Sequence, residues 1–227
     1  MKQCNPIKNF YTNNIHLADY FDNDKKLLMK LIVVGIMAML ALNTPLFLMN
    51  YFDAGLDNAI YSMLFVETFL SALMYILVLK GRKAFNMRIS QNKKTLIIMF
   101  CVFVGAFILK TMPYDFFQKN GPTDAIELTP QLVITLMFIV PFYEEIIFRG
   151  CLFGGFCFLF KKNILAAMIM TSIIFAVSHA SFFNIGDQIE LFLTGMLLNH
   201  ARVLSRGFFY PILLHSFANL LFLYVNF

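Results

Sequence analysis

The stretch PFYEEIIFRG, residues 141–150, places two adjacent glutamates and an arginine inside an apolar segment. Glu145 and Arg149 are four residues apart with the acid first, which is the favoured order for an ion pair on a helix. Glu144 lies about 100° around the helix from Glu145, so the same arginine does not obviously serve it. A carboxylate that is removed from water can act as a general base near neutral pH. Glu144 is therefore a candidate general base, and a charge network that only fixes helix packing is the alternative.

Two later segments carry polar residues at the same helical spacing. FAVSH places Phe175 and His179 four residues apart, and HSFAN does the same for His215 and Asn219. Residues at this spacing lie on one face of a helix. A lone buried histidine is most often a core residue whose hydrogen bonds are satisfied. Two histidines, an asparagine and an unpaired glutamate on three separate segments instead favour a shared site.

The positions of these residues along the chain allow them to meet. Glu144 lies 17 residues before Lys161, and His179 lies 17 residues after Lys162. If the chain forms a helical hairpin that turns at the two lysines, Glu144 and His179 lie at about the same depth. His215 lies 12 residues before the C-terminus, within the middle half of its own segment, so it can reach the same level.

This set of side chains suits the hydrolysis of an amide bond. Glu144, oriented with His179, would take a proton from a water molecule that attacks a peptide carbonyl. His215 and the Asn219 amide would donate hydrogen bonds to the resulting oxyanion. A general base and a stabilised oxyanion are the two parts that amide hydrolysis most needs.

The composition predicts that helices spanning a membrane position these residues. The chain has 227 residues, of which 59% are hydrophobic and 14% charged, and its mean hydropathy is +0.72. A soluble domain of this size must cover its exterior with polar side chains, so we expect an all-α, polytopic membrane helical bundle. Apolar segments long enough to cross about 30 Å of hydrocarbon as helices predict about seven transmembrane helices, at 27–49, 59–79, 95–112, 129–158, 163–180, 188–204 and 208–226.

The distribution of lysine and arginine predicts the orientation of the chain. These residues gather in the N-terminal tail, in the loop 80–94, at 161–162 and at 202–206, whereas the alternate loops carry mostly Asp and Glu. Positive charge marks the cytoplasmic side, so the N-terminus is expected in the cytoplasm and the C-terminus outside. The net charge of +5 therefore reflects membrane topology among lipids and indicates no nucleic-acid partner. The content of Lys, Asn, Phe and Ile favours a low-GC bacterial origin, so the expected location is a bacterial plasma membrane.

The same pattern divides the chain into three predicted parts. These are a polar cytoplasmic tail at 1–26, leading transmembrane helices at 27–128, and a helical core at 129–227 that holds the candidate site residues named above. One ionisable residue of the leading helices, Glu67, falls inside a span. A charge that faces lipid costs at least ~2–3 kcal/mol, so Glu67 should face the interior of the bundle. It would contact Arg149, line the substrate path or lie near a water-filled cavity.

Three motifs on hydrophobic helices, in the order EExxxR, FxxxH and HxxxN, resemble the CPBP family of CAAX-processing and bacteriocin-processing enzymes, also called the Abi family. The resemblance covers roughly residues 129–227. It implies an intramembrane endopeptidase of the glutamate type without a cofactor. The substrate class it implies is a hydrophobic or lipidated peptide or protein: a bacteriocin, a pheromone, a leader segment or a prenylated protein. It indicates no particular oligomeric state.

Carried over position by position, the resemblance gives each motif residue a role. The catalytic positions are a base, its partner and two oxyanion donors, which are Glu144, His179, His215 and Asn219. The supporting positions are Glu145, Arg149 and Phe175.

Alternative functions use the same residues. Glu144, His179 and His215 could be three ligands of a catalytic zinc ion. The HExxH signature is absent, and Asn219 suits an oxyanion donor better than a zinc ligand. A second alternative is a non-catalytic bacteriocin self-immunity protein or membrane scaffold. A third is a transporter whose buried Glu and His relay protons, although the chain has no obvious inverted repeat.

Overall fold

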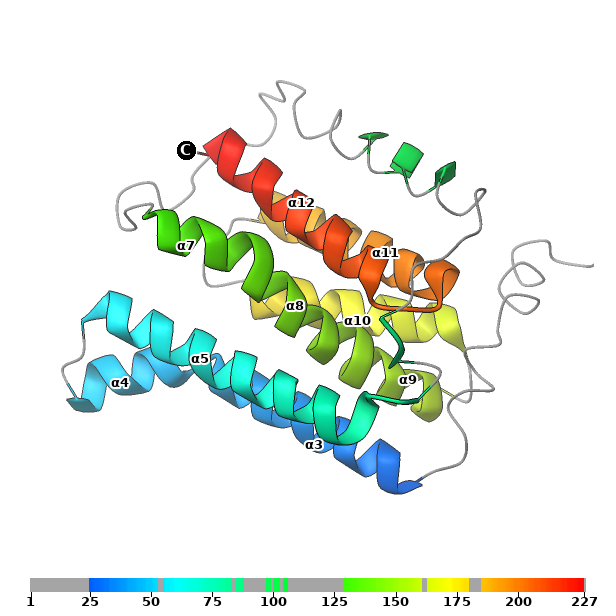
Figure 1. The fold of residues 1–227 in the computed structure, drawn as a ribbon, viewed down its shortest axis with the longest axis horizontal. Helices are drawn as coiled ribbons and strands as arrows, with labels where there is room; N and C mark the ends of the chain where they lie inside the picture. The colour runs from blue at the N-terminus through cyan, green and yellow to red at the C-terminus, as the bar shows by residue number, and fades with distance from the viewer. Residues whose placement is uncertain are drawn as a thin grey trace, which may run out of the picture.

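A central helix of five joined segments runs through the molecule and carries the EExxxR motif (Figure 1). In this computed structural model the described residues are 25–52, 55–82, 85–87, 97–98, 100–102, 104–105, 129–160, 163–179 and 185–226. Within them the regular elements are helices and none is a strand, which confirms the all-α prediction. The tail 1–24 and most of the predicted span 95–112 lie outside these ranges.

The central helix begins and ends where the sequence provides caps. Its segments are α7 (Pro130–Ile134), η3 (Thr135–Ile139), α8 (Val140–Glu144), η4 (Glu145–Leu152) and α9 (Phe153–Leu159), where η marks π-helical turns. At its start the Thr129 hydroxyl accepts a hydrogen bond from the amide of Leu132 at 3.2 Å, and Pro130 occupies the first turn, where its missing N–H is not needed. After its end, the Asn163 side chain caps the next helix in the same way, at 3.2 Å from the amide of Ala166.

Two groups of helices pack against the central helix from different sides (Figure 1). The first group consists of α3 (Lys25–Ala41), α4 (Thr44–Phe52), α5 (Leu56–Met74) and its π-helical extension η1 (Tyr75–Leu79). The second group consists of α10 (Ile164–Ser178), α11 (Ile185–Ser205) and α12 (Phe209–Asn226). Within these groups, α3 and α5 contact η4 and α8, whereas α10, α11 and α12 contact η4, α8 and η3. The EExxxR motif therefore lies between the leading helices and the last three helices.

The first predicted span, 27–49, is not one helix. The chain leaves the helical path at Leu42 and Asn43, and α4 starts again at Thr44. Pro45 explains the break, because a proline inside a continued helix would remove a backbone hydrogen bond and clash with the preceding turn. In the first turn of a new helix the same residue is well placed.

Within the part of the chain that the structure describes, two helices are long and apolar enough to cross a membrane, Asn58–Leu79 and Pro130–Leu159. Ile164–Ser178 and Phe209–Tyr224 are apolar but shorter. Large apolar side chains also cover much of the outer surface, for example Phe65, Phe69 and Leu77 of α5 and η1, which are 59% to 71% exposed. These features support helices in contact with lipid, and the count of seven remains a prediction.

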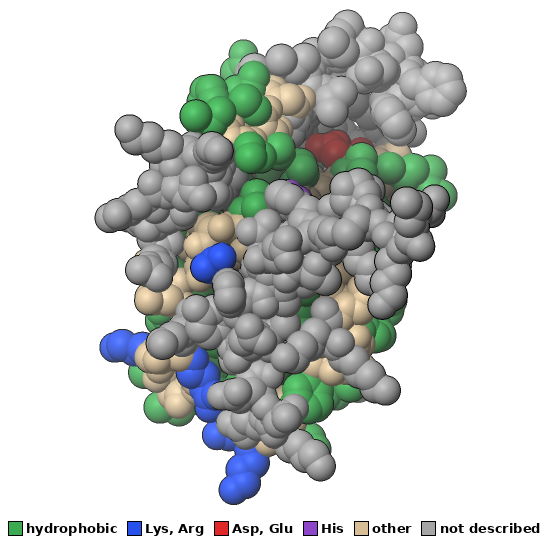
Figure 2. All heavy atoms as spheres, turned by 90° about the vertical axis from the view of Figure 1, so that its right-hand side faces the viewer, with side chains coloured by type: hydrophobic (Ala, Val, Ile, Leu, Met, Phe, Trp, Pro, Cys, Tyr) green, Lys and Arg blue, Asp and Glu red, His purple; other side chains and the backbone are tan. Residues whose placement is uncertain are grey.

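One end of the bundle is basic. Figure 2 views this end and shows Lys and Arg side chains gathered in its lower left part, whereas acidic side chains are seen in its upper part. The exposed cations among the described residues lie where α3 begins and where η1 and α11 end, and they are Lys26, Lys30, Lys80, Arg82 and Arg206. This end corresponds to the side that the sequence predicts to be cytoplasmic.

The position of Arg202 differs from the predicted one. The sequence pattern placed it in a basic loop, but it lies within α11 and is fully buried. Its guanidinium group lies 4.5 Å from the ring centre of Phe208 and 5.9 Å from that of Phe85. Stacking on aromatic faces stabilises a buried guanidinium, so this residue is part of the packing between elements.

Candidate active site

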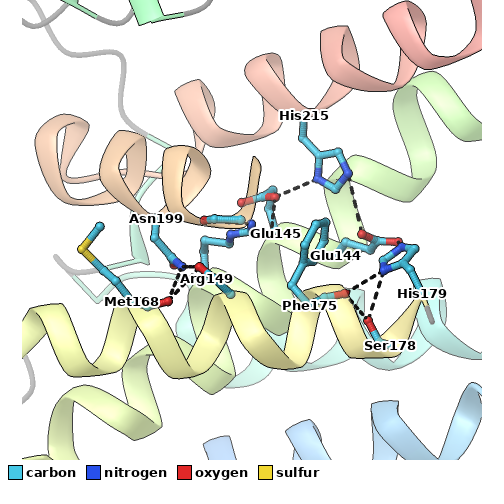
Figure 3. A network of polar contacts seen from close by, with 11 residues as sticks. Glu144, Glu145, Arg149, Met168, Phe175, Ser178, His179, Asn199 and His215 are labelled. Atoms are coloured by element: carbon cyan, nitrogen blue, oxygen red, sulfur yellow. Dashed lines mark hydrogen bonds and ion pairs between the residues drawn. The ribbon is translucent and has the colours of Figure 1, made fainter. Parts of the chain in front are cut away.

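Glu144 lies between two histidines that come from different helices (Figure 3). His179 Nε2 is 3.9 Å from Glu144 Oε1, and His215 Nε2 is 3.7 Å from Glu144 Oε2. The prediction that Glu144 and His179 lie at the same depth is therefore confirmed. The turn of the predicted hairpin, at residues 161–162, lies outside the described residues. Both distances exceed a direct hydrogen bond, and a separation of this size is one that a water molecule can bridge.

The exposure of the three side chains differs. The side chain of His179 is 27% exposed, that of Glu144 is 10% exposed and that of His215 is 5% exposed. His179 is the residue that ends α10, so its ring lies at the rim of the packed region. His179 is therefore the more accessible of the two histidines, and His215 is buried.

The predicted ion pair between Glu145 and Arg149 is present. Arg149 Nη1 donates to Glu145 Oε1 at 2.9 Å, and both side chains are fully buried. Arg149 Nη2 also donates to the backbone carbonyl of Gly195 at 3.4 Å, and the guanidinium group lies 4.6 Å from the ring centre of Phe175. Phe175 thus packs against the ion pair.

Gly195 allows α11 to supply this carbonyl at close range. A Cβ atom at Gly195 would lie 3.1 Å from Ser172 Cβ and 3.2 Å from Ser172 Cα on α10. Such contacts are tighter than ordinary van der Waals contact, so a larger residue would require the two helices to move apart slightly, and glycine permits their close approach. Asn199, one turn further along α11, donates to the Met168 carbonyl at 3.2 Å and to Ser172 Oγ at 3.1 Å (Figure 3).

The other nitrogen of each histidine is held by a hydrogen bond that fixes the ring. His215 Nδ1 donates to Glu145 Oε1 at 2.8 Å, and His179 Nδ1 donates to the carbonyl oxygen of Phe175 at 2.8 Å. A carbonyl or carboxylate oxygen can only accept, so the Nδ1 atom of each ring carries the proton. The Nε2 atoms then face Glu144 as acceptors in the neutral rings and as donors in the charged rings.

Asn219 has a structural partner that the sequence did not reveal. Its Nδ2 atom donates to the carbonyl oxygen of Leu136 at 2.8 Å. The amide of Val140 bonds to the carbonyl of Thr135, five residues back. In the same register the Leu136 carbonyl would require an amide at position 141, which is a proline and has none. Asn219 therefore satisfies a carbonyl that Pro141 leaves without a backbone donor, and this bond attaches α12 to η3.

Glu67 is a further buried acidic residue near the site. It is 3% exposed, and its carboxylate is hydrogen-bonded with the Tyr143 hydroxyl group and lies within electrostatic range of Glu144. Glu67 therefore faces the bundle interior, as its position in an apolar span predicts. Its neighbours are Tyr143 and Glu144 rather than Arg149. Tyr143 was missed by sequence reasoning, and its position directly before the EExxxR motif was the only available signal.

No group of three or more His, Cys, Asp or Glu side chains within the described ranges has the arrangement of a metal site. Glu144, His179 and His215 do meet, but as a carboxylate facing two imidazoles at 3.9 and 3.7 Å. We derive no step of the chemistry through a metal ion.

Comparison with known proteins supports the resemblance over this part of the chain. Residues 127–221 match the family model described as Type II CAAX prenyl endopeptidase Rce1-like, which confirms the resemblance to the CAAX-processing enzymes for that segment. The segment contains all seven predicted site residues. An uncharacterized 24.3 kDa protein of Escherichia coli is 31% identical over 129 residues, which are 54% of this chain. The chain spans 58% of the length of that relative. No solved structure matches the chain.

Proposed function

We propose that the protein is an intramembrane endopeptidase in which Glu144 activates a water molecule. The observation that carries the proposal is the position of the Glu144 carboxylate between His179 Nε2 and His215 Nε2, at 3.9 and 3.7 Å. The match of residues 127–221 to an endopeptidase family supports the same reaction.

The attacking water lies between Glu144 and His179 in this proposal. One of its protons faces Glu144 Oε1, and the other faces His179 Nε2, which is an acceptor because Nδ1 carries the ring proton. The water oxygen bonds to the substrate carbonyl carbon as one proton passes to Glu144. Glu144 then gives this proton to the amide nitrogen, the carbon–nitrogen bond breaks, and a carboxylic acid and an amine leave.

His215 and Asn219 stabilise the oxyanion of the tetrahedral intermediate. Nε2 of His215 donates a hydrogen bond only when the ring is charged, because Nδ1–H is already directed at Glu145. His215 Nδ1 lies 2.8 Å from Glu145 Oε1, and Arg149 holds that carboxylate in place. The Asn219 amide has two N–H groups, and one of them remains for the oxyanion when the other is bonded to Leu136.

The surroundings of the site support a hydrophobic or lipidated peptide or protein as substrate. Apolar side chains cover the exterior of the helices that flank Glu144, and two of the helices are long enough to cross a membrane. We extend this to a multi-pass protein with about seven spans, a cytoplasmic N-terminus and a core at 129–227 that follows the leading helices. Bacteriocin, pheromone, leader and prenyl-protein processing all fall within this substrate class.

A comparison of membrane peptides tests the proposed function. Cells that carry the wild type, Glu144→Gln or the matched control Glu190→Gln are compared by mass spectrometry of their membrane peptides. Glu190 is an exposed carboxylate of α11, so its change leaves the site intact. We expect a precursor to accumulate with Glu144→Gln only. Identical profiles for all three, with equal insertion, would favour a non-catalytic immunity or scaffold protein.

Metal removal separates the glutamate mechanism from the zinc alternative. Purified protein is treated with a chelator and assayed on the precursor that the comparison identifies. The glutamate mechanism predicts unchanged cleavage after thorough removal of metal. Loss of cleavage that returns on addition of zinc would support the zinc alternative.

A further inference from the structure

Asn199 is a buried polar residue of α11 that belongs to none of the three sequence motifs. Its side chain is fully buried, and its Nδ2 atom donates to two groups of α10, the Met168 carbonyl at 3.2 Å and Ser172 Oγ at 3.1 Å (Figure 3). Ser172 Oγ donates in turn to the Met168 carbonyl at 2.8 Å, so the three groups form a closed set of hydrogen bonds. Met168 and Ser172 are four residues apart. One amide group therefore joins α11 to two successive turns of α10.

The bonds of Asn199 lie beside a close approach of the two helices. Gly195 is one turn before Asn199 on α11, and a Cβ atom there would lie 3.1 Å from Ser172 Cβ and 3.2 Å from Ser172 Oγ. Between apolar helices, small residues permit close packing, and hydrogen bonds from asparagine side chains hold the pair together. The Asn199 amide thus fixes the separation of α10 and α11 at the level of Gly195 and Ser172.

This separation determines how Arg149 is held. From α11 the Gly195 carbonyl accepts a hydrogen bond from Arg149 Nη2 at 3.4 Å, and from α10 the Phe175 ring centre lies 4.6 Å from the guanidinium carbon. Gly195 is one turn before Asn199, and Phe175 is three residues after Ser172, so both contacts lie next to the bonds of Asn199. A donor–acceptor distance of 3.4 Å is near the upper limit of a hydrogen bond, so a small increase in helix separation breaks this contact.

Arg149 connects the two helices to His215. Arg149 Nη1 donates to Glu145 Oε1 at 2.9 Å, and the same oxygen accepts from His215 Nδ1 at 2.8 Å. His215 Nε2 lies 3.7 Å from Glu144 Oε2. Three successive hydrogen bonds therefore lead from the Gly195 carbonyl to the ring that faces Glu144.

We propose that Asn199 is a positioning residue of the site, because it holds α10 against α11 in the arrangement that places Arg149. Arg149 in turn keeps the Glu145 carboxylate at Nδ1 of His215, the proposed oxyanion donor. The inference rests on the proposed function for its catalytic meaning, since it assigns Asn199 to the placement of His215. It adds a side chain of α11 to a site whose other side chains come from the central helix, α10 and α12.

The kinetics of Asn199→Ala separate a positioning role from a role in stability alone. The change removes the amide and leaves Ser172 Oγ bonded to the Met168 carbonyl. We expect kcat for a membrane peptide to fall by about 10–10²-fold, which is the cost of a misplaced catalytic group. KM should not change, because the buried amide is out of reach of the substrate. A lower unfolding temperature with an unchanged kcat overturns the proposal.

Nuclear magnetic resonance of the His215 ring measures the same geometry without requiring cleavage. The purified full chain carries isotope-labelled histidine in lipid nanodiscs, and the His215 Nδ1–H signal is identified by its absence in His215→Gln. A proton held between a ring nitrogen and a buried carboxylate exchanges slowly with water and gives a resolved signal. We expect this signal to shift or disappear in Asn199→Ala. A signal identical to that of the wild type overturns the proposal.

The matched control is Thr171→Val, at the position of α10 next to Ser172. Thr171 is also fully buried, but its hydroxyl group donates to the Ala167 carbonyl within α10, at 2.8 Å. We expect the kcat and the His215 signal of the wild type in this variant. A change equal to that of Asn199→Ala overturns the proposal.

Ser172→Ala decides the question if Asn199→Ala does not fold. It removes one of the two acceptors of Asn199 and leaves the bond to the Met168 carbonyl. We expect a smaller fall in kcat, together with a change in the His215 signal. If Asn199→Ala does not fold and Ser172→Ala matches the wild type in both measurements, the proposal fails.

The two measurements also keep the two proposals separate. If neither the wild type nor any variant cleaves a peptide, the proposed function fails. The His215 signal then still decides whether Asn199 positions the ring.

Discussion

At the scale of single residues, the contacts of Arg149 explain how the ionisable side chains of Arg149, Glu145 and His215 are held inside apolar packing. Its guanidinium group pairs with Glu145, bonds to the Gly195 carbonyl and stacks on Phe175. Glu145 in turn accepts from His215 Nδ1, so one oxygen atom binds both the Arg149 cation and the His215 ring. Glu144 has no such direct partner, and its Oε2 atom has no hydrogen bond to the described protein atoms.

Removal of one member of this pair should cost more than removal of both. Arg149→Met leaves the Glu145 charge buried without its cation, and we expect a loss of about 3–5 kcal/mol in the free energy of unfolding. The double change Glu145→Gln and Arg149→Met removes both charges and should recover part of that loss. Thermal unfolding of the purified variants measures the difference. Equal stability of Arg149→Met and the wild type would contradict a structural role for the pair.

The sequence predicted one interaction within a helix and one contact across a helical hairpin. The spacing of Glu145 and Arg149 indicated their ion pair directly, and the counts around residues 161–162 indicated that Glu144 and His179 meet. The bond between His215 and Glu145 and the contact of Glu67 with Tyr143 join distant segments. Their partners depend on helix packing, which no local spacing encodes.

At the scale of elements, the π-helical turns of the central helix determine which backbone groups need partners. The widened turn at η3 and the missing N–H of Pro141 together expose the Leu136 carbonyl, and Asn219 supplies the donor. The carbonyl could not be predicted, because the sequence shows the proline but not the π-helical register. The break between α3 and α4 did have a signal, since Thr44 and Pro45 form a typical helix start.

A double change separates the structural role of Asn219 from its proposed catalytic role. Asn219→Ala removes the donor to Leu136, and we expect a stability loss of about 1 kcal/mol and a rate loss of about 10²–10³-fold. Pro141→Ala restores a backbone N–H that can satisfy the Leu136 carbonyl. The double variant should therefore regain stability but not activity, as measured by thermal unfolding and by cleavage rate. Recovery of both would show that Asn219 acts only in the fold.

At the scale of the whole molecule, one end of the bundle is basic, and the site lies in the middle of the central helix. Glu144 is 14 residues from the start of that helix and 15 from its end, so it lies near mid-depth if the helix crosses the membrane. The composition alone predicted the all-α class. The third span, at 95–112, lies mostly outside the described residues, so the count of seven stays a prediction.

Thiol labelling tests the predicted orientation. In a variant without native cysteines, Lys80→Cys places a thiol at the basic end, and Ile185→Cys places one where α11 begins, at a position that is 82% exposed. A reagent that does not cross membranes should label Ile185→Cys in intact cells and Lys80→Cys only after lysis. The reverse pattern would invert the proposed topology.

The most direct test of the central claim is the cleavage rate of purified Glu144→Gln on a membrane peptide that the wild type hydrolyses. Loss of a general base typically lowers a rate by about 10²–10⁴-fold, and we predict a loss in this range. The Glu190→Gln control should cleave at the rate of the wild type. A Glu144→Gln protein that unfolds at the same temperature as the wild type and still cleaves at the wild-type rate would contradict the account.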